Sequence, residues 1–133
     1  MSNAANQPSH DCAFCNLPEL RIVHANELAV VVRDAYPVAP GHSLVIPRRH
    51  AGSFFELQPS EQAAMLSLLD RARADLEREF APDGYTIGIN DGAAAGQTVP
   101  HVHLHLIPRH RADVDDPRGG IRWVLPAKAR YWP

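Results

Sequence analysis

The chain has 133 residues, of which 45% are hydrophobic and 21% are charged, and its formal net charge is −2. This length suffices for a single domain with one core. The balanced charge excludes the broad basic excess that long nucleic acids attract, and no apolar run reaches membrane-spanning length. A small anionic ligand needs only a local positive pocket, so the composition leaves such a ligand open.

The first residues are polar and carry neither the basic region nor the apolar region of a secretory signal. We expect residues 1–11 to form a disordered tail and residues 12–133 to form one domain, with a C-terminal extension from about residue 111. Without an export signal, the cytoplasm is the expected location, where thiols stay reduced.

Apolar runs rich in valine and isoleucine predict three strands in the first part of the chain, at residues 22–23, 29–33 and 42–46. Residues 34–41 form a proline-containing loop, and Pro47 ends the third predicted strand.

The clearest helix runs from residue 59 to about residue 80. Pro59 is a favourable first helical residue, and Glu61 suits the first turn. Charged residues at positions 71, 73, 75, 77 and 78 are expected on the solvent side. Apolar residues recur at steps of three and four and predict one buried stripe, formed by Met65, Leu69, Ala72, Leu76 and Phe80.

After the helix, alternating residues predict a strand at 85–90, a loop of small residues follows at 91–96, and the strongest strand pattern covers 101–107. Strands, one long helix and two further strands predict an α+β fold with a mostly antiparallel sheet.

Three histidines alternate with apolar residues along the last predicted strand. His101, His103 and His105 share one face, while the residues between them share the other. The apolar face should pack on the long helix, so the imidazole face should line a cleft or meet solvent. One histidine is usually a bystander, whereas three on one face indicate a function.

Spacing argues against one metal ion shared by all three rings. Same-face positions lie about 6.8 Å apart on a strand, whereas a Zn–N bond is about 2 Å. A neutral imidazole is a good nucleophile at pH 7, and its neighbours can bind phosphate oxygens or protonate a leaving group. We therefore predict that His103 attacks phosphorus and that His105 contacts the substrate.

The loop before this strand suits a phosphate. The segment from Gly92 to Gly96 has little side-chain bulk, so backbone N–H groups can approach an anion closely. Gln97 and Thr98 add neutral hydrogen-bonding groups.

The two cysteines, Cys12 and Cys15, allow two readings. They are a redox pair or half of a zinc site that needs two more ligands, although no thioredoxin-like pattern surrounds them. Histidines are available: His10 is a spare candidate, and His24 and His110 are expected at the surface.

Residues 96–109 resemble the signature of the histidine triad (HIT) family, and residues 40–47 resemble the family's other recognisable segment. Asn90 stands at the family's usual offset before the loop. The resemblance covers roughly residues 12–110 in the expected order. It implies an α+β domain with a five-stranded antiparallel sheet, one long helix and a short second helix, usually as a homodimer. Apolar C-terminal residues are available for the interface, namely Trp123, Val124 and Trp132.

The resemblance also implies a reaction and a site. It implies a nucleotide hydrolase or nucleotidyl transferase that cleaves a purine nucleotide at the α-phosphate through a covalent nucleotidyl-histidine. Its substrates are dinucleoside polyphosphates or nucleoside phosphoramidates, and the ending Pro108-Arg109 looks more like the polyphosphate-hydrolase, fragile-histidine-triad-like branch. The implied catalytic residues are His103, His105, His42 and Gln97. The implied substrate-binding residues are Asp34, Asn90, Gly96, Gln97, Thr98 and His105, with Asp34 as the ribose-binding acid.

Zinc-bearing members of the family resemble this chain as well. That resemblance implies a closed structural zinc site formed by Cys12, Cys15, His50 and His101, which leaves His103 free of metal.

Two alternatives to a nucleotide hydrolase stay open at this point. One is a nucleotide-binding regulatory module with incidental hydrolysis, and the other is a metalloenzyme that uses the triad as ligands. Residues 118–123 provide either extra cationic contacts to a polyphosphate or surface charge.

Overall fold

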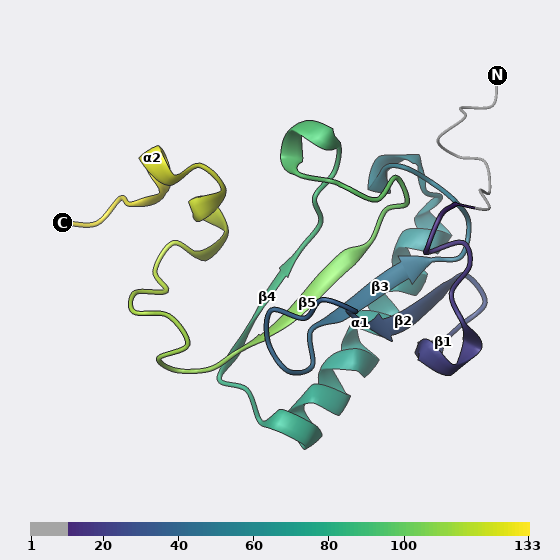
Figure 1. The fold of residues 1–133 in the computed structure, drawn as a ribbon, viewed down its shortest axis with the longest axis horizontal. Helices are drawn as coiled ribbons and strands as arrows, with labels where there is room; N and C mark the ends of the chain where they lie inside the picture. The colour runs from purple at the N-terminus through teal and green to yellow at the C-terminus, as the bar shows by residue number, and fades with distance from the viewer. Residues whose placement is uncertain (1–10) are drawn as a thin grey trace.

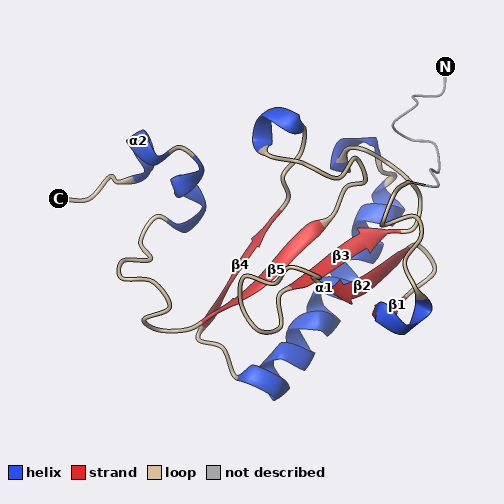
Figure 2. Cartoon of the chain, in the orientation of Figure 1, coloured by secondary structure: helices blue, strands red, loops and turns tan. Residues whose placement is uncertain are grey.

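A computed structural model describes residues 11–133, and the expected tail lies outside this range except for Asp11. The described chain forms five strands and two α-helices, together with short 3-10 turns (Figures 1 and 2). The helices are α1 (Pro59–Phe80) and α2 (Pro126–Ala129). The strands are β1 (Ile22–Ala25), β2 (Ala29–Arg33), β3 (Ser43–Pro47), β4 (Gly84–Gly88) and β5 (Leu104–Arg109).

All neighbouring strands are antiparallel, in the order β1-β2-β3-β5-β4. The α+β architecture with a five-stranded sheet, one long helix and a short second helix is therefore confirmed. Because β5 inserts between β3 and β4, Leu44 of β3 lies opposite His105 of β5. Segments that are 61 residues apart in sequence thus meet at the centre of the sheet.

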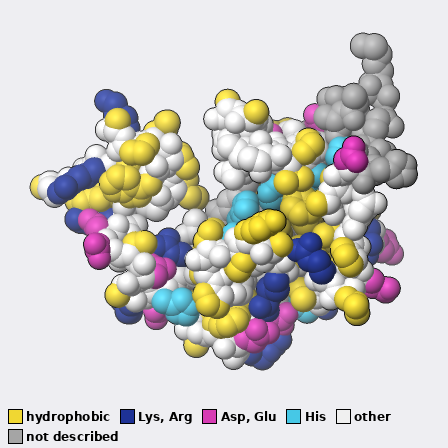
Figure 3. Space-filling view, in the orientation of Figure 1, with side chains coloured by type: hydrophobic (Ala, Val, Ile, Leu, Met, Phe, Trp, Pro, Cys, Tyr) yellow, Lys and Arg dark blue, Asp and Glu magenta, His cyan; other side chains and the backbone are white. Residues whose placement is uncertain are grey.

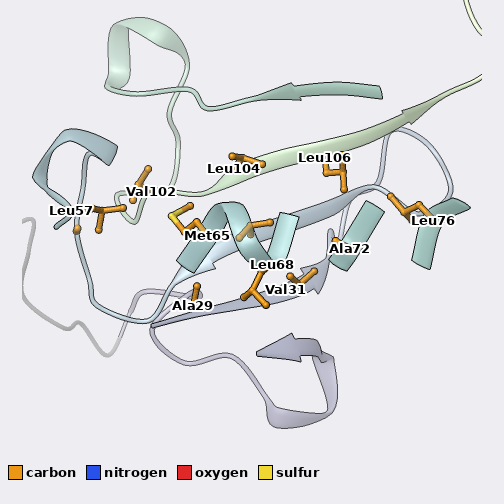
Figure 4. Packing of buried hydrophobic residues seen from close by; sticks show 12 residues of the cluster. Ala29, Val31, Leu57, Met65, Leu68, Ala72, Leu76, Val102, Leu104 and Leu106 are labelled. Atoms are coloured by element: carbon orange, nitrogen blue, oxygen red, sulfur yellow. The ribbon is translucent and has the colours of Figure 1, made fainter. Parts of the chain in front are cut away.

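Helix α1 covers one face of the sheet and encloses the main core (Figure 4). Its start is fixed by a capping box, in which the backbone N–H of Gln58 donates to Glu61 Oε1 at 2.8 Å. Glu61 is itself buried and paired with Arg49, with 2.9 Å between Arg49 Nη2 and Glu61 Oε1. The apolar residues between the histidines face this helix, as predicted: Val102 just before β5, and Leu104 and Leu106 within it.

The helix is rotated slightly from the predicted stripe. Leu68 is fully buried, whereas Leu69 and Phe80 pack only at the margin of the core. Leu68 and Leu69 both fit a helical spacing with the other apolar residues, so periodicity alone does not choose between them. The position of the sheet under the helix determines which of the two is buried. Asp75 and His24, both expected at the surface, are half-buried and bonded to each other.

The strand predicted at residues 101–107 begins only at Leu104 and continues to Arg109. Pairing with β3 stops at Leu104, and the N–H of Val102 instead donates to the carbonyl of Ala51 at 2.8 Å. Pro108 is tolerated inside β5 because β3 pairs only with residues 104–106, so at Pro108 only β4 lies alongside.

The other face of the sheet is divided into two halves. Over β2 and β3, a small apolar cluster of Val30, Val32, Leu44 and Ile46 is covered by Phe14, Leu17 and Ile22. At the start of β5, His103 and His105 lie on this face, and the Phe14 ring contacts that of His103. The segment that contains Phe14 and Leu17 therefore lies next to the histidines.

The C-terminal segment leaves the sheet after β5 and lies beyond the β4 edge (Figure 1). It is held by its own contacts: the guanidinium of Arg118 lies 4.5 Å from the Trp132 ring centroid, and the indole N–H of Trp123 donates to the Arg118 carbonyl at 2.7 Å. Within residues 11–133, no helix is both long and apolar enough to cross a membrane.

Candidate functional site

The two cysteines meet two histidines from distant parts of the chain. His101 Nδ1 lies 3.5 Å from both Cys12 Sγ and Cys15 Sγ and 3.3 Å from His50 Nδ1, and Cys15 Sγ lies 3.1 Å from His50 Nδ1. One donor atom from each residue lies within 4.8 Å of the other three. The structure thus brings together all four predicted metal ligands.

These distances fit a tetrahedral ion. Zn–S bonds of about 2.3 Å and Zn–N bonds of about 2.0–2.1 Å give ligand–ligand edges of roughly 3.3–3.8 Å at tetrahedral angles. The measured separations of 3.1–3.5 Å lie close to that range. The cluster can therefore hold a metal with little movement of its side chains.

The orientation of His101 is set by a backbone partner. His101 is fully buried, and its Nε2–H donates to the carbonyl of Pro47 at 2.8 Å. This bond leaves the Nδ1 lone pair directed at the cysteines, as in other histidine ligands whose second nitrogen is hydrogen-bonded. Burial lowers the pKa of His101, which favours the neutral, ligating form. The expectation that all three rings face a cleft or solvent was wrong for His101, because the chain departs from the strand there.

His103 has a different environment. It is half-buried, and its Nδ1–H donates to the backbone carbonyl of His101 at 2.9 Å. In a neutral imidazole this bond leaves the lone pair on Nε2, which is the arrangement a nucleophile requires. His103 is absent from both groups of clustered metal-ligating side chains found in the described residues.

His42 and His105 form a hydrogen-bonded pair beside His103. The backbone N–H of Val38 donates to His42 Nδ1 at 3.2 Å, which places the proton of a neutral His42 on Nε2. His42 Nε2 lies 2.9 Å from His105 Nδ1, so this proton is donated to His105. The remaining His105 nitrogen, Nε2, then carries a proton and can donate to a phosphate oxygen.

Burial keeps this pair neutral. It is the main cause that lowers the pKa of both His42 and His105, and the neighbouring His103 and His42 lower the pKa of His105 further. Asp34 opposes the shift in both histidines, with its Oδ2 3.4 Å from His42 Nε2. Asp34, His42 and His105 also form a possible metal-binding group by distance alone. The Val38 donor and the His42–His105 bond already use three of the four ring nitrogens, which leaves only His105 Nε2 for a ligand.

The small-residue loop is fastened by Gln97. Its Oε1 accepts from the N–H of Gly92 at 2.7 Å, and its Nε2 donates to the carbonyls of Gly52 and Val99 at 2.8 and 2.9 Å. Gly92 and Gly96 adopt φ values of 94° and 95°, a conformation that favours glycine. In this structure the Gln97 amide shapes the loop, and Gly96 and Thr98 lie exposed on it.

A pocket of about 740 Å³ opens beside the histidines and separates the sheet from the C-terminal segment. His42, His105 and Asn90 line it, whereas His103, Asp34 and the predicted loop residues do not. Figure 3 shows histidine side chains gathered in a hollow on this face. The opposite wall comes from the C-terminal segment and includes Ile121, Trp123 and Val124.

Sequence reasoning missed three contributors to the site. The Val38 N–H and the Pro47 carbonyl fix histidine tautomers, and as backbone groups they leave no mark in the sequence. Phe14 contacts His103 with 5.0 Å between ring centroids. Its position between the two cysteines was the only available signal.

Comparison with known proteins identifies the class. The family model described as "HIT domain" matches residues 18–112. The chain belongs to the HIT domain family, and its triad of histidines occupies the site just described.

Among curated proteins, the chain is 38% identical over 96 residues to the bis(5'-nucleosyl)-tetraphosphatase [asymmetrical] of Schizosaccharomyces pombe, covering 72% of this chain and 53% of that enzyme. It therefore spans about half the length of that relative. It is also 38% identical over 95 residues to the bis(5'-adenosyl)-triphosphatase of Dictyostelium discoideum, covering 71% of this chain and 64% of that protein.

Among solved structures, the chain resembles a Zn-bound histidine triad family protein from Mycobacterium smegmatis, with 36% identity and a TM-score of 0.69. The match covers 77% of this chain and 78% of that one.

Proposed function

We propose that this chain hydrolyses dinucleoside polyphosphates at the α-phosphate, with His103 as the nucleophile. The observation that carries the proposal is the 2.9 Å bond from His103 Nδ1 to the His101 carbonyl, which leaves Nε2 unprotonated beside His105. The two relatives whose names specify a tetraphosphatase and a triphosphatase support this substrate class.

The reaction proceeds in two displacements. His103 Nε2 attacks the α-phosphorus, the bond to the bridging oxygen breaks, and the leaving nucleotide departs with that oxygen. Water then attacks the phosphorus, the P–N bond breaks, and nucleoside monophosphate is released with His103 restored. His105 Nε2–H donates to a phosphate oxygen and stabilises the charge that develops there, while His42 orients His105.

The remaining predicted residues are assigned supporting roles. Asp34 and Asn90 are proposed to contact ribose or phosphate, and Gly96, Gln97 and Thr98 are proposed to present the loop to the phosphate. The hydrogen bonds of the Gln97 amide support a role in holding this loop rather than in direct proton transfer. Nucleoside phosphoramidates are the second substrate class to test, because the same nucleophile can attack them.

Zinc is the proposed occupant of the cluster of Cys12, Cys15, His50 and His101. The two sulfur and two nitrogen donors suit zinc, and the Zn-bound relative supports the choice. With four protein ligands the site is closed and structural, and it ties the N-terminal segment to the triad. Neither chemical step needs the ion.

A homodimer and a cytoplasmic location complete the proposal. Among the described residues β4 pairs only with β5, so its outer edge is available to a second copy. Trp123 and Val124 are exposed and suit an interface, whereas Trp132 is covered by Arg118. The cytoplasm is proposed because both cysteines are free thiols placed to bind metal.

A substrate panel with product analysis tests the function. The wild-type chain should release AMP from a diadenosine polyphosphate, with a transient nucleotidylated His103 detectable by mass. His103→Ala should abolish turnover and retain nucleotide binding. Equal turnover by this variant would remove His103 from the mechanism. Micromolar nucleotide binding by the wild type without turnover would favour a regulatory module instead.

A further inference from the structure

Phe14 stands at the tip of the turn that carries both cysteines. The turn is closed on the carbonyl of Cys12, which accepts the N–H of Cys15 at 3.2 Å and the Asn16 side-chain amide at 2.8 Å. Between these anchors the chain forms neither helix nor strand, and the Phe14 ring points toward the triad.

The Phe14 ring contacts two of the three histidines. Its centroid lies 5.0 Å from that of His103 at an interplanar angle of 71°, and 6.0 Å from that of His101 at 85°. These are edge-to-face arrangements, which are favoured between aromatic rings. His105 also contacts His103, with centroids 5.0 Å apart at 63°. The imidazole of His103 thus contacts two other rings.

These contacts restrain the motions that would spoil His103 as a nucleophile. A flip of the imidazole would break the bond from Nδ1 to the His101 carbonyl and turn Nε2 away from its direction of attack. Displacement at phosphorus requires the attacking and leaving atoms to lie roughly in line. The orientation of the ring therefore bears directly on the rate.

The turn itself is fastened through its sulfur atoms. Cys12 Sγ lies 3.5 Å from His101 Nδ1, and Cys15 Sγ lies 3.1 Å from His50 Nδ1. Coordination of one shared ion by these residues would tie the chain down on both sides of Phe14. The same ion would fix His101, whose carbonyl holds His103.

We propose that Phe14 is a positioning residue for His103, and that metal binding by Cys12 and Cys15 holds Phe14 in place. The proposal rests on the proposed function of His103 as the nucleophile. It gives the metal site a second effect besides stability, because the site sets the orientation of a reactive ring that does not bind the ion.

The competing explanation is that Phe14 only fills space. Its ring also packs on the apolar cluster of Val30, Val32, Leu44 and Ile46. Leu17 packs on the same cluster but makes no ring contact with His103. Leu17→Ala is therefore a matched control that loosens this packing and leaves the His103 contact in place.

The kinetic test uses the full chain loaded with zinc and diadenosine tetraphosphate as substrate. Phe14→Leu keeps an apolar side chain but removes the ring, so kcat should fall roughly 10-fold while KM stays within about twofold. Leu17→Ala should lower Tm at least as much as Phe14→Leu does and keep kcat within about twofold. Equal losses of kcat in both variants would reduce Phe14 to a packing residue and overturn the proposal.

The second readout needs no turnover. Nitrogen-15 spectra of the histidine rings, assigned to His103 by comparison with His103→Gln, should show one tautomer with the proton on Nδ1 in the zinc-loaded wild type. In Phe14→Leu, and in wild type treated with a chelator at a temperature where it stays folded, the two ring nitrogens should move toward averaged shifts. Unchanged His103 signals in Phe14→Leu would overturn the proposal. If chelation unfolds the chain, the spectrum of Phe14→Leu decides.

The two readouts separate this proposal from the proposed function. If no nucleotide is turned over by the wild type, the proposed function fails, and the spectra alone decide whether Phe14 fixes the His103 ring.

Discussion

His42 Nε2 and His105 Nδ1 lie 2.9 Å apart, and the backbone N–H of Val38 fixes which of the two rings donates. Burial lowers the pKa of both histidines, so the pair is neutral at pH 7. In the neutral pair, the N–H group at His105 Nε2 is the one not used between the two rings, and it can donate to a phosphate oxygen.

The first prediction concerns the acidic limb of the pH profile of kcat/KM. Protonation of His42 or His105 would break their hydrogen bond, and because the pKa of both is lowered, the part of the acidic limb that this pair causes should lie below pH 6.5. In His42→Gln the like charge that lowers the pKa of His105 is gone, so the limb should move to higher pH. A steady-state profile from pH 4.5 to 8 measures this shift.

Asp34→Asn is the opposing control. The Asp34 carboxylate raises the pKa of both histidines, so its neutralisation should move the acidic limb to lower pH. The position of the limb is compared, because the size of kcat/KM also reflects substrate contacts. Shifts in the same direction in both variants would contradict the assignment of the limb to this pair.

The second prediction concerns metal content. His101→Ala should lose bound zinc, because it removes one of four ligands and the partner of Pro47. His105→Ala should retain zinc, because His105 lies outside the cluster with Cys12 and Cys15. Metal analysis of both purified variants decides the matter, and zinc loss in His105→Ala would favour a metalloenzyme that uses the triad as ligands.

Much of the fold follows from periodicity. The bounds of α1 match the prediction because Pro59 marks its start and Pro82 and Gly84 follow its end. The alternation behind the histidines located the face of β5 that packs on α1. Such patterns are local, so a single sequence displays them.

The features that could not be predicted from the sequence depend on contacts between distant segments. The sequence placed His101 on a strand, whereas the Cys12–Cys15 turn and the Pro47 carbonyl draw its ring inward. The four metal ligands were identified through family resemblance, because no spacing rule links residues 12 and 101. The contact between Phe14 and His103 depends on how the turn sits over the sheet, and periodicity carries no information about that.

The third prediction concerns Glu61, which caps α1 and pairs with Arg49. Glu61→Ala removes both interactions and leaves Arg49 without its carboxylate partner, so the free energy of unfolding should fall by about 2 kcal/mol. Asp70→Ala on the same helix is the control, because the Asp70 side chain is 79% exposed and its loss should change stability by less than about 0.5 kcal/mol. Urea unfolding of both variants measures the difference.

The pairing also predicts a pH dependence. The hydrogen bond from Arg49 lowers the pKa of Glu61 below its ordinary value of 4.5. The folded state therefore gains stability from this group above pH 4.5 and loses it as the pH falls toward the lowered pKa, since the unfolded chain takes up the proton first. In Glu61→Ala this part of the acid destabilisation should be absent, and an unchanged slope of stability against pH would contradict the assignment.

The fourth prediction tests the approach of the His42 loop to the helix. Gly41 has a φ of 90°, and a Cβ atom there would lie 2.7 Å from both Leu76 Cδ2 and Phe80 Cε2. Gly41→Ala therefore combines backbone strain with overpacking, and it should lower the free energy of unfolding by about 2–4 kcal/mol. Because His42 follows directly, kcat should fall even at temperatures where the variant is fully folded. Gly84→Ala has open space around the added methyl group, so it should leave both stability and kcat nearly unchanged. A Gly41→Ala chain as stable as wild type would show that the loop can lift away from α1, and the buried position of His42 would then need another explanation.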